Sequence, residues 1–292
     1  MKIQTECIPC LIKRVIFEVE QSTSDKNLQI RIIQNICHLL GDLYDPDECS
    51  AYIATKVHQR TYQLLKDTDP YAVLKDQSNS VACSLVADVT RCVAQSKNPI
   101  KTSMICAIVG NILDFGIDGG STNPENLTNL FYKLYREKLG HDDFAKVQSL
   151  LEKSRHLIYF TDNSGEIVFD KIVCQELKKA YPELDITLVV RGKPVLSDAT
   201  LADVKQIGFD SVVDRVLTTG CFAVGVDFRR LPKQVKQRLD SADLIVCKGM
   251  ANYETFSETR YKPILYLLRT KCSPIARSMG LPVNKNIIKL EY

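Results

Sequence analysis

The stretch "LIYFTDNSGEIVFDK", residues 157–171, decides the fold class. Its four leading apolar residues, 157–160, are typical of a strand that is buried on both faces. Further on, Ile167, Val168 and Ile172 recur at helical spacing. The stretch therefore predicts a strand, a tight turn and a helix, with Asp162 and Asn163 in the turn.

The polar pair in this turn marks a candidate site. In an open parallel sheet, ligands bind outside the carboxyl ends of the strands, which is where Asp162 and Asn163 would project. The alternative is that one of them caps the following helix, because Asp and Asn are common in that position. A cap needs only one polar residue, so capping leaves the second one unexplained.

The rest of the chain divides into two parts. Residues 1–150 are predicted to be mainly helical, because their apolar residues recur three and four apart. From residue 151 onward, helical stretches alternate with short apolar runs, namely "LIYF", "ITLVVR", "SVVDRVL", "LIVCKG" and "ILYLLR". Such alternation predicts an α/β fold. We expect a helical N-terminal domain over 1–150 that contributes to the pocket, followed over 151–292 by a Rossmann-like, mainly parallel sheet flanked by helices.

Composition narrows the class of protein. The 292 residues are 45% apolar and 25% charged, as in an ordinary globular protein. The 38 basic and 35 acidic residues nearly cancel and form no basic cluster, so we expect no nucleic-acid partner. The amino end lacks the apolar region of a signal peptide, and no apolar run approaches the length of a membrane span. We therefore predict a cytoplasmic protein without a membrane partner.

The chain has eleven cysteines, and two of them, Cys7 and Cys10, form the motif "CIPC". A disulfide framework is not expected in a chain of this size without a secretory signal, so we predict reduced thiols. The motif is compatible with a second metal site, with thiol exchange, or with a helix start that has Pro9 near its beginning. No second Cys-x-x-Cys or Cys-x-x-His pair completes a zinc site, and all three interpretations stay open.

Polar residues follow several of the predicted strands. If the strands are parallel, these side chains converge on one rim of the sheet, and they comprise Asp162, Asn163, Arg191, Asp198, Lys248, Asn252, Arg269 and Lys271. Carboxylate and carboxamide oxygens suit a divalent metal, and Lys and Arg suit phosphoryl oxygens. Separately, Asp198 has a second interpretation as the cap of a helix beginning at Ala199, and Lys248 as a lysine that reaches solvent.

Six segments together resemble one known family. They are "CIPC", "GNILDFG" at 110–116, "DNSGEIVFD" at 162–170, "VVRGKPVLSDAT" at 189–200, "ADLIVCKGMANYET" at 242–255 and "LLRTKC" at 267–272. In their order and in their coverage of nearly the whole chain they resemble the metal-dependent damage-control phosphatases, formerly named domain of unknown function eighty-nine. The chain looks most like the compact stand-alone branch of archaea and bacteria.

This resemblance implies a set of site residues and a cofactor. A divalent ion (Mn²⁺, Mg²⁺, Ni²⁺ or Co²⁺) would be held by Asp162, Asn163 and Asp198. Catalytic roles would fall on Asp162, Lys248 and Lys271. Substrate contacts would involve Asn111, Asp114, Glu166, Arg191 and Asn252. Asn111 and Asp114 follow from the resemblance alone, through "GNILD", and would overhang the pocket from the helical part.

The expected function is hydrolysis of phosphomonoesters of small metabolites, such as sugar phosphates and related, including damaged, phosphometabolites. We expect metal-assisted attack of water, and a competing mechanism makes Asp162 a nucleophile that forms an aspartyl-phosphate. Alternative functions are a carboxyl methyltransferase that uses S-adenosylmethionine, a non-catalytic phosphometabolite- or nucleotide-binding protein, and a Cys-rich metal or redox module. The turn "TDNSGE" lacks the glycine-rich pattern that a dinucleotide-like cofactor usually requires. The oligomeric state stays open.

Overall fold

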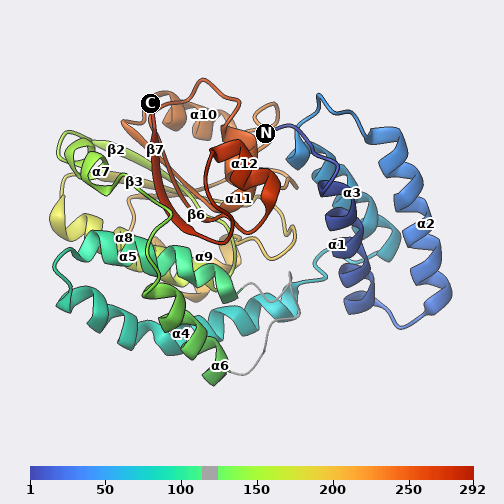
Figure 1. The fold of residues 1–292 in the computed structure, drawn as a ribbon, viewed down its shortest axis with the longest axis horizontal. Coiled ribbons are helices and arrows are strands. Elements are labelled where there is room, and N and C mark those ends of the chain that lie inside the picture. The colour runs from blue at the N-terminus through green and yellow to red at the C-terminus, as the bar shows by residue number, and fades with distance from the viewer. Residues whose placement is uncertain (114–123) are drawn as a thin grey trace.

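A mixed sheet forms the centre of the computed structural model, which describes residues 1–113 and 124–292 (Figure 1). The strands of these residues are β1 (His141–Asp142), β2 (His156–Phe160), β3 (Asp185–Val190), β4 (Arg215–Thr218), β5 (Leu244–Lys248), β6 (Ile264–Arg269) and β7 (Asn286–Glu291). Their order is β1-β7-β6-β5-β2-β3-β4, and β6 with β7 is the antiparallel pair. The predicted α/β fold with a mainly parallel sheet is confirmed.

Most of the predicted apolar runs coincide with strands. β2, β3, β5 and β6 lie on the expected stretches, whereas only the last residues of "SVVDRVL" enter β4. The edge strand β1 and the antiparallel strand β7 were not predicted. Strand β7 pairs with β6, and β1 pairs with β7. Only two consecutive apolar residues, Ile287 and Ile288, precede Lys289 in β7.

The helices of the described residues cover both faces of the sheet. They are α1 (Cys7–Ser22), α2 (Lys26–Leu43), α3 (Ser50–Leu65), α4 (Ala72–Gln95), α5 (Pro99–Val109), α6 (Pro124–Tyr135), α7 (Phe144–Leu151), α8 (Glu166–Ala180), α9 (Leu201–Gln206), α10 (Lys233–Asp240), α11 (Gly249–Phe256) and α12 (Ser273–Met279). Two 3₁₀ turns, Gly110–Leu113 and Phe209–Ser211, accompany them. None of the helices in the described parts of the chain is long and apolar enough to cross a membrane.

Alternation along β2 shows how the layers are built. Leu157 and Tyr159 pack into a core shared with helices α4 to α9, and Ile158 and Phe160 pack into a core shared with α10, α11 and α12. Successive strand residues point to opposite faces, so a strand buried on both sides is apolar throughout. The sheet is therefore the middle layer of an α/β/α sandwich.

Helices α1, α2 and α3 have an apolar core of their own, at one end of the molecule (Figure 1). This core also takes in Val195, Leu196, Phe222 and Val224 from loops beyond the sheet. The helices α4 and α5 also precede residue 150, but they pack on the sheet layer along α8. The domain boundary near residue 150 stays a prediction.

The motif "CIPC" begins a helix. Cys7 is the first residue of α1, and Pro9 lies in its first turn. All eleven cysteines of the chain are free thiols in the structure. This placement agrees with the structural interpretation of the motif. The metal-binding and thiol-exchange interpretations stay predictions.

The strand order places a crevice between β2 and β5. From β2 the chain proceeds outward through β3 and β4, and then returns to the other side of β2 to form β5 and β6. Ligands of doubly wound sheets bind at such a switch point, outside the carboxyl ends of the strands. We call the carboxyl ends of β2, β3, β5 and β6, with the loops that follow them, the rim.

Candidate functional site

The turn after β2 carries Asp162 and Asn163 without using either as a helix cap. Helix α8 begins at Glu166, its capping residue is Gly165, and no side chain caps it. Asp198 is not a cap either, since α9 begins at Leu201 behind Thr200, which forms a capping box with Asp203. The capping alternatives for all three residues are thus removed.

Backbone contacts bring Asp162, Asn163 and Asp198 together, although 36 positions of chain separate the first from the last. Asn163 and Asp198 form an isolated antiparallel bridge. The amide of Ala199 donates to the carbonyl of Asp162 at 2.8 Å, and the amide of Ser164 donates to the carbonyl of Ser197 at 2.8 Å. The loop after β3 is therefore stitched along the turn after β2, and the three candidate ligands face one cleft.

Each candidate ligand is oriented by a neighbouring side chain. Asn163 Oδ1 accepts from Ser197 Oγ at 2.9 Å, and Asn163 Nδ2 donates to Asp162 Oδ2 at 3.0 Å. Asp198 Oδ2 accepts from Arg191 Nε. No hydrogen bond from the residues described here reaches Asp162 Oδ1, and the closest cation to it is Arg191, whose Nη2 lies 4.0 Å away.

The charges at this point fit a bound cation. Burial, together with the carboxylates of Glu166 and Asp198, raises the pKa of Asp162 well above its ordinary range, against the opposite pull of Arg191 and Lys248. Arg191 Nη2 is buried and has no hydrogen-bond partner within the described ranges. Crowded buried acids of this kind favour a nearby positive charge.

The candidate donor set includes one neutral ligand, the carboxamide of Asn163, beside two acids. Within the parts of the chain that the structure describes, no three Cys, His, Asp or Glu side chains are arranged to hold a metal. The candidate set instead joins two carboxylates to one carboxamide. Such oxygen donors suit hard divalent ions and leave coordination positions for water and substrate.

A buried ionic network lies beneath the rim. Lys248 Nζ donates to Glu166 Oε1 at 2.5 Å, to Asp170 Oδ1 at 2.7 Å and to the carbonyl of Ala107 at 3.1 Å. The hydroxyl of Tyr159 donates to the same oxygen of Asp170 at 2.7 Å. An ammonium group has three hydrogens, so Lys248 is saturated by protein acceptors. Burial lowers its pKa, but the two carboxylates outweigh that effect and raise it.

Glu166 connects this network to the candidate ligands. Its Oε2 accepts from Asn111 Nδ2 at 2.5 Å and from Asn163 Nδ2 at 3.3 Å. Asn111 Nδ2 also lies 3.3 Å from Asp162 Oδ2. Glu166 therefore links Lys248 to the amide of Asn163, which Ser197 and Asp162 also contact.

The network makes stability depend on pH through Asp170. Burial raises the pKa of Asp170 to about 6, although Lys248 pulls it down. The unfolded chain titrates near pH 4, so the folded state binds more protons between about pH 4 and pH 6. Asp170 therefore contributes stability that is present below pH 4 and lost as the pH rises through 6.

We expect the Asp170→Asn variant to reveal this loss. Between pH 4 and pH 7, the free energy of unfolding of the wild type should fall relative to that of the variant, by at most roughly 3 kcal/mol. Urea titrations across this range measure the difference. Asp88→Asn, which removes a partner of an exposed ion pair, is the control. If the free energy of unfolding of the wild type stays constant or rises with pH relative to that of the variant, the assignment is contradicted.

The first residue of α11 must be glycine. Gly249 has a φ of +74°, and a Cβ atom at this position would overlap the carboxylate of Asp162. The absent side chain thus lets Asp162 pack against the backbone that follows β5. This contact ties the two strands of the switch point together.

Gly249→Ala should therefore displace Asp162. We expect turnover to fall roughly 100-fold, because small misplacements of catalytic groups have effects of that size. The free energy of unfolding should fall by about 1–3 kcal/mol from backbone strain. Gly41→Ala in α2 is a matched control, since nothing lies within 4 Å of its added Cβ. That control should be neutral or stabilising by up to about 1 kcal/mol. Normal turnover in Gly249→Ala would show that Asp162 needs no such packing.

A cleft of about 840 Å³, here called the rim cleft, opens above the candidate ligands. Its floor includes Asp162, Asn163 and Asp198. One wall comes from α1 and α3, and a second wall from the loop after β6 and the start of α12. Lys271 lies on this second wall, and its Nζ donates to the carbonyl of Asn111 at 3.1 Å.

The predicted site residues fall into three groups. Those that line the rim cleft are Cys7, Cys10, Asn111, Asp162, Asn163, Asp198 and Lys271. Those that are buried behind it are Glu166, Arg191, Lys248 and Asn252. Asn252 donates to the carbonyls of Thr161 and Lys248, and so joins the ends of β2 and β5. Asp114 lies outside the described residues.

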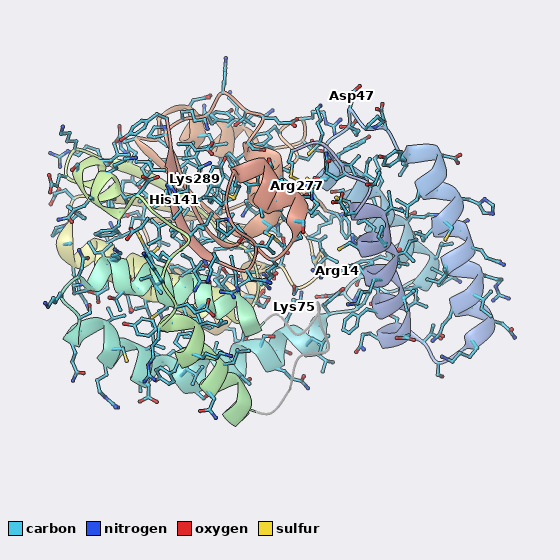
Figure 2. All side chains as sticks on the ribbon, viewed as in Figure 1. Arg14, Asp47, Lys75, His141, Arg277 and Lys289 are labelled. Atoms are coloured by element: carbon cyan, nitrogen blue, oxygen red, sulfur yellow. The ribbon has the colours of Figure 1, made fainter. Side chains whose placement is uncertain are left out.

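Several residues of the cleft wall were not predicted. On α1 they include Lys13, Arg14 and Phe17, and on α3 they include His58. Figure 2 labels Arg14 on the flank of α1 that is turned toward the rest of the molecule. The signal was present in the sequence, because Cys7, Cys10, Arg14 and Phe17 are spaced three or four apart and so share one helix face.

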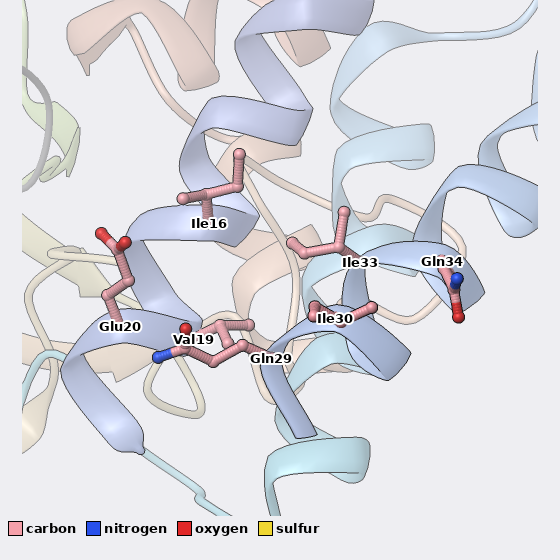
Figure 3. A pocket seen from close by; sticks show the side chains of 7 residues that line it. All are labelled: Ile16, Val19, Glu20, Gln29, Ile30, Ile33 and Gln34. Atoms are coloured by element: carbon pink, nitrogen blue, oxygen red, sulfur yellow. The ribbon is translucent and has the colours of Figure 1, made fainter. Parts of the chain in front are cut away.

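A second, smaller hollow of about 270 Å³ lies between α1 and α2 (Figure 3). It is lined by Ile16, Val19, Glu20, Gln29, Ile30, Ile33 and Gln34. This lining is mainly apolar and shares no residue with the rim cleft. The chemistry of the molecule is therefore assigned to the rim.

Comparison with known proteins agrees with the motifs. Residues 3–287 match the family model of the damage-control phosphatase ARMT1-like domain. A protein of Archaeoglobus fulgidus named damage-control phosphatase is 37% identical over 290 residues, which are 99% of each chain. A damage-control phosphatase of Pyrococcus horikoshii is 28% identical over 282 residues, which are 97% of this chain and 96% of that one.

The fold has a close counterpart among solved structures. The crystal structure of a DUF89 family protein from Pyrococcus horikoshii matches with a TM-score of 0.91 at 27% identity, and the match covers 100% of both chains. The resemblance inferred from the six sequence segments is thereby confirmed. From its motifs, its fold and its full-length relatives, the chain belongs to the damage-control phosphatase family.

Proposed function

We propose that this chain is a divalent-metal-dependent phosphatase that hydrolyses phosphomonoesters of small metabolites, damaged ones included. The observation that carries the proposal is the meeting of Asp162, Asn163 and Asp198 at the switch point of the sheet, on the floor of a cleft with Lys271 in its wall. Family membership supports the phosphatase activity. The metal and the substrate class are our inference from the donor set and the cleft.

Asp162, Asn163 and Asp198 are the residues that would hold the ion, which we propose to be Mn²⁺, Mg²⁺, Ni²⁺ or Co²⁺. When bound, such an ion polarises a phosphoryl oxygen and activates a water molecule. The remaining work falls to side chains that orient the donors. Arg191 donates a hydrogen bond to one carboxylate oxygen of Asp198, and Ser197 donates one to the amide oxygen of Asn163.

The two lysines of the site have different roles in this proposal. Lys271 lines the rim cleft and is placed to offset charge on the phosphoryl group. Lys248 was expected to do the same, but it is fully buried and saturated by Glu166, Asp170 and Ala107. We propose that Lys248 acts through Glu166, by holding the amide of Asn163 in position.

Metal replacement with a substrate panel tests the proposal. The protein is stripped with a chelator, each of the four ions is added back, and phosphate release is measured from p-nitrophenyl phosphate and a panel of sugar phosphates. We expect no release from the stripped protein and recovery with at least one ion. Release that is equal with and without metal would exclude the metal-dependent mechanism. Tight binding without release from any ester would favour a non-catalytic binding protein.

A further inference from the structure

We propose that His58 is a substrate-binding residue of the rim cleft, and that Glu18 is the residue that positions its ring. His58 would bind a hydroxyl group on the organic part of the phosphoester while the phosphoryl group lies on the floor. This inference rests on the proposed function, because that function assigns the phosphoryl group to the floor of the same cleft.

The position of His58 on α3 brings it toward the floor. The α3 residues that line the rim cleft, spaced four apart on one face of the helix, are Ser50, Ala54 and His58. The next residue on this face, Tyr62, accepts a hydrogen bond from the amide of Leu196 at 3.0 Å. Leu196 lies two positions before Asp198, and one helical turn of about 5.4 Å separates Tyr62 from His58. Of the three lining residues, His58 is therefore the closest along α3 to the loop that carries Asp198.

A buried contact holds one edge of the imidazole ring. His58 Nδ1 lies 2.8 Å from Glu18 Oε1 of α1, and the two side chains are 1% and 0% exposed. Both atoms are buried without an aligned hydrogen bond to any described residue, so the contact is electrostatic. Taking a carboxylate out of water is costly unless a polar or charged partner lies against it. Glu18 thus holds the Nδ1 edge of the ring against α1.

The second nitrogen of the ring faces the cleft. No hydrogen bond from the described residues reaches His58 Nε2, and this atom is not among the unpartnered polar atoms of those residues that are fully buried. His58 is also a lining residue of the rim cleft. The small part of the side chain that solvent reaches therefore includes Nε2, which is open to a ligand in the cleft.

A hydroxyl group suits this nitrogen in either protonation state of the ring. Nε2 accepts a hydrogen bond when the proton of a neutral imidazole lies on Nδ1, and it donates one when it carries a proton itself, whereas a hydroxyl group does both. A phosphoryl group at the floor fills a small part of the cleft volume of about 840 Å³, so the carbon body of a sugar or polyol phosphate has room to reach α3. His58 would then favour phosphoesters with a hydroxyl group at that point over esters with an apolar body.

A purely structural role for the buried pair predicts a different behaviour. If Glu18 and His58 only fasten α1 to α3, a change of either residue affects all phosphoesters alike. If Nε2 binds the substrate, the effect depends on the organic part of the ester. Dependence on the substrate therefore separates the two roles.

Histidine resonances report the contact directly, because the chain has four histidines and His58 is the one that lines the rim cleft among the described residues. The full chain, with ¹³C-labelled histidine and Mg²⁺, is titrated to saturation with the phosphonate analogue of the sugar phosphate that the panel favours. A parallel titration uses methylphosphonate, which lacks the sugar. We expect the Cε1–H signal of His58 to shift with the sugar phosphonate alone, while those of His38, His141 and His156 stay in place. A His58 signal that stays in place, or that shifts equally with both compounds, would overturn the proposal.

Substitution of His58 should change the choice between substrates. In His58→Ala we expect the ratio of kcat/KM for the favoured sugar phosphate to kcat/KM for phenyl phosphate to fall about tenfold. The loss should arise mainly from KM for the sugar phosphate, because phenyl phosphate offers the ring no hydroxyl group. His38→Ala, which changes an exposed histidine of α2 outside the cleft, is the control and should keep the wild-type ratio. An unchanged ratio in His58→Ala would refute the substrate contact.

Two variants of Glu18 test its positioning role. Glu18→Leu removes the contact at Nδ1 and should lower the same ratio about tenfold, whereas Glu18→Gln keeps an oxygen there and should recover most of it. A wild-type ratio in Glu18→Leu would show that Glu18 does not position the ring. The double variant Glu18→Leu with His58→Leu replaces the buried pair by apolar side chains, so it keeps the test of His58 valid if His58→Ala fails to fold.

The titration also separates failure of this inference from failure of the proposed function. If no ester is hydrolysed with any ion, the proposed function fails, and the phosphonate analogue of glucose 6-phosphate still tests binding at His58. A shift of the His58 signal with this compound but not with methylphosphonate supports the contact, and no shift refutes it. Metal-dependent hydrolysis with an unchanged substrate ratio in His58→Ala refutes this inference alone.

Discussion

Asp162→Ala should lower metal-dependent phosphate release by roughly 1,000-fold or more while the protein stays folded. Asp162 is a proposed ligand with one oxygen turned to Asn163 and Asn111 and the other 4.0 Å from Arg191 Nη2. Its pKa is raised by burial and by the acids around it, so its removal relieves repulsion in the folded state. Activity and stability should therefore respond in opposite ways.

Two measurements check this expectation. Phosphate release is compared with that of Asp88→Ala, an exposed residue of α4 paired with Arg91, which should behave like the wild type. Urea unfolding and calorimetric titration with Mn²⁺ are run on the same preparations, and metal affinity should fall in the Asp162 variant alone. Undiminished turnover in that variant would refute the ligand assignment.

Lys248→Met should have the largest effect on stability. The change leaves Glu166 and Asp170 buried without their shared ammonium group, and breaking a buried ion pair in this way costs about 3–5 kcal/mol. Lys271→Met lies in the cleft wall and should lower turnover about 100-fold with little loss of stability. Both lysines were predicted to contact phosphate, and the unfolding curves of the two variants would thus distinguish their roles.

A double variant makes this comparison specific. Asp170→Asn introduced into Lys248→Met removes one of the stranded charges, so it should recover part of the lost free energy of unfolding. Equal stability losses in Lys248→Met and Lys271→Met would contradict the division of roles. So would a double variant whose two effects simply add.

The rim residues were accessible from the sequence because strand ends in a parallel sheet share one edge. Asp162 follows "LIYF" directly, and no tertiary detail is needed to place it outside β2. It is harder to predict from the sequence to which face of the sheet a rim side chain points. Lys248 is the last residue of β5 and shares a face with Val246, so it points into the core that α5 and α8 cover. The alternation of a strand predicts that Lys248 faces this core, but it does not predict that Asp170 lies there to pair with it.

Other parts of the cleft depend on how distant elements meet. Asn111 was placed by family resemblance, since nothing in the spacing of "GNILD" brings it to Glu166. The wall that α1 gives to the rim cleft depends on how the core of α1, α2 and α3 packs against loops beyond the sheet, and the sequence does not show that packing. Strand β7 escaped prediction because it runs antiparallel at one side of the sheet, where helix and strand alternation no longer applies.

The separate core of α1, α2 and α3 has an evolutionary consequence. This core reaches the chemistry through Val195 and Leu196, which lie just before Ser197 and Asp198. Mutations inside the core would therefore shift a candidate ligand, whereas mutations of the outward residues of α1 and α2 would leave it in place. Descendants of such a chain should vary more on the outer surface of these helices than in their buried faces, and an engineered library would follow the same division.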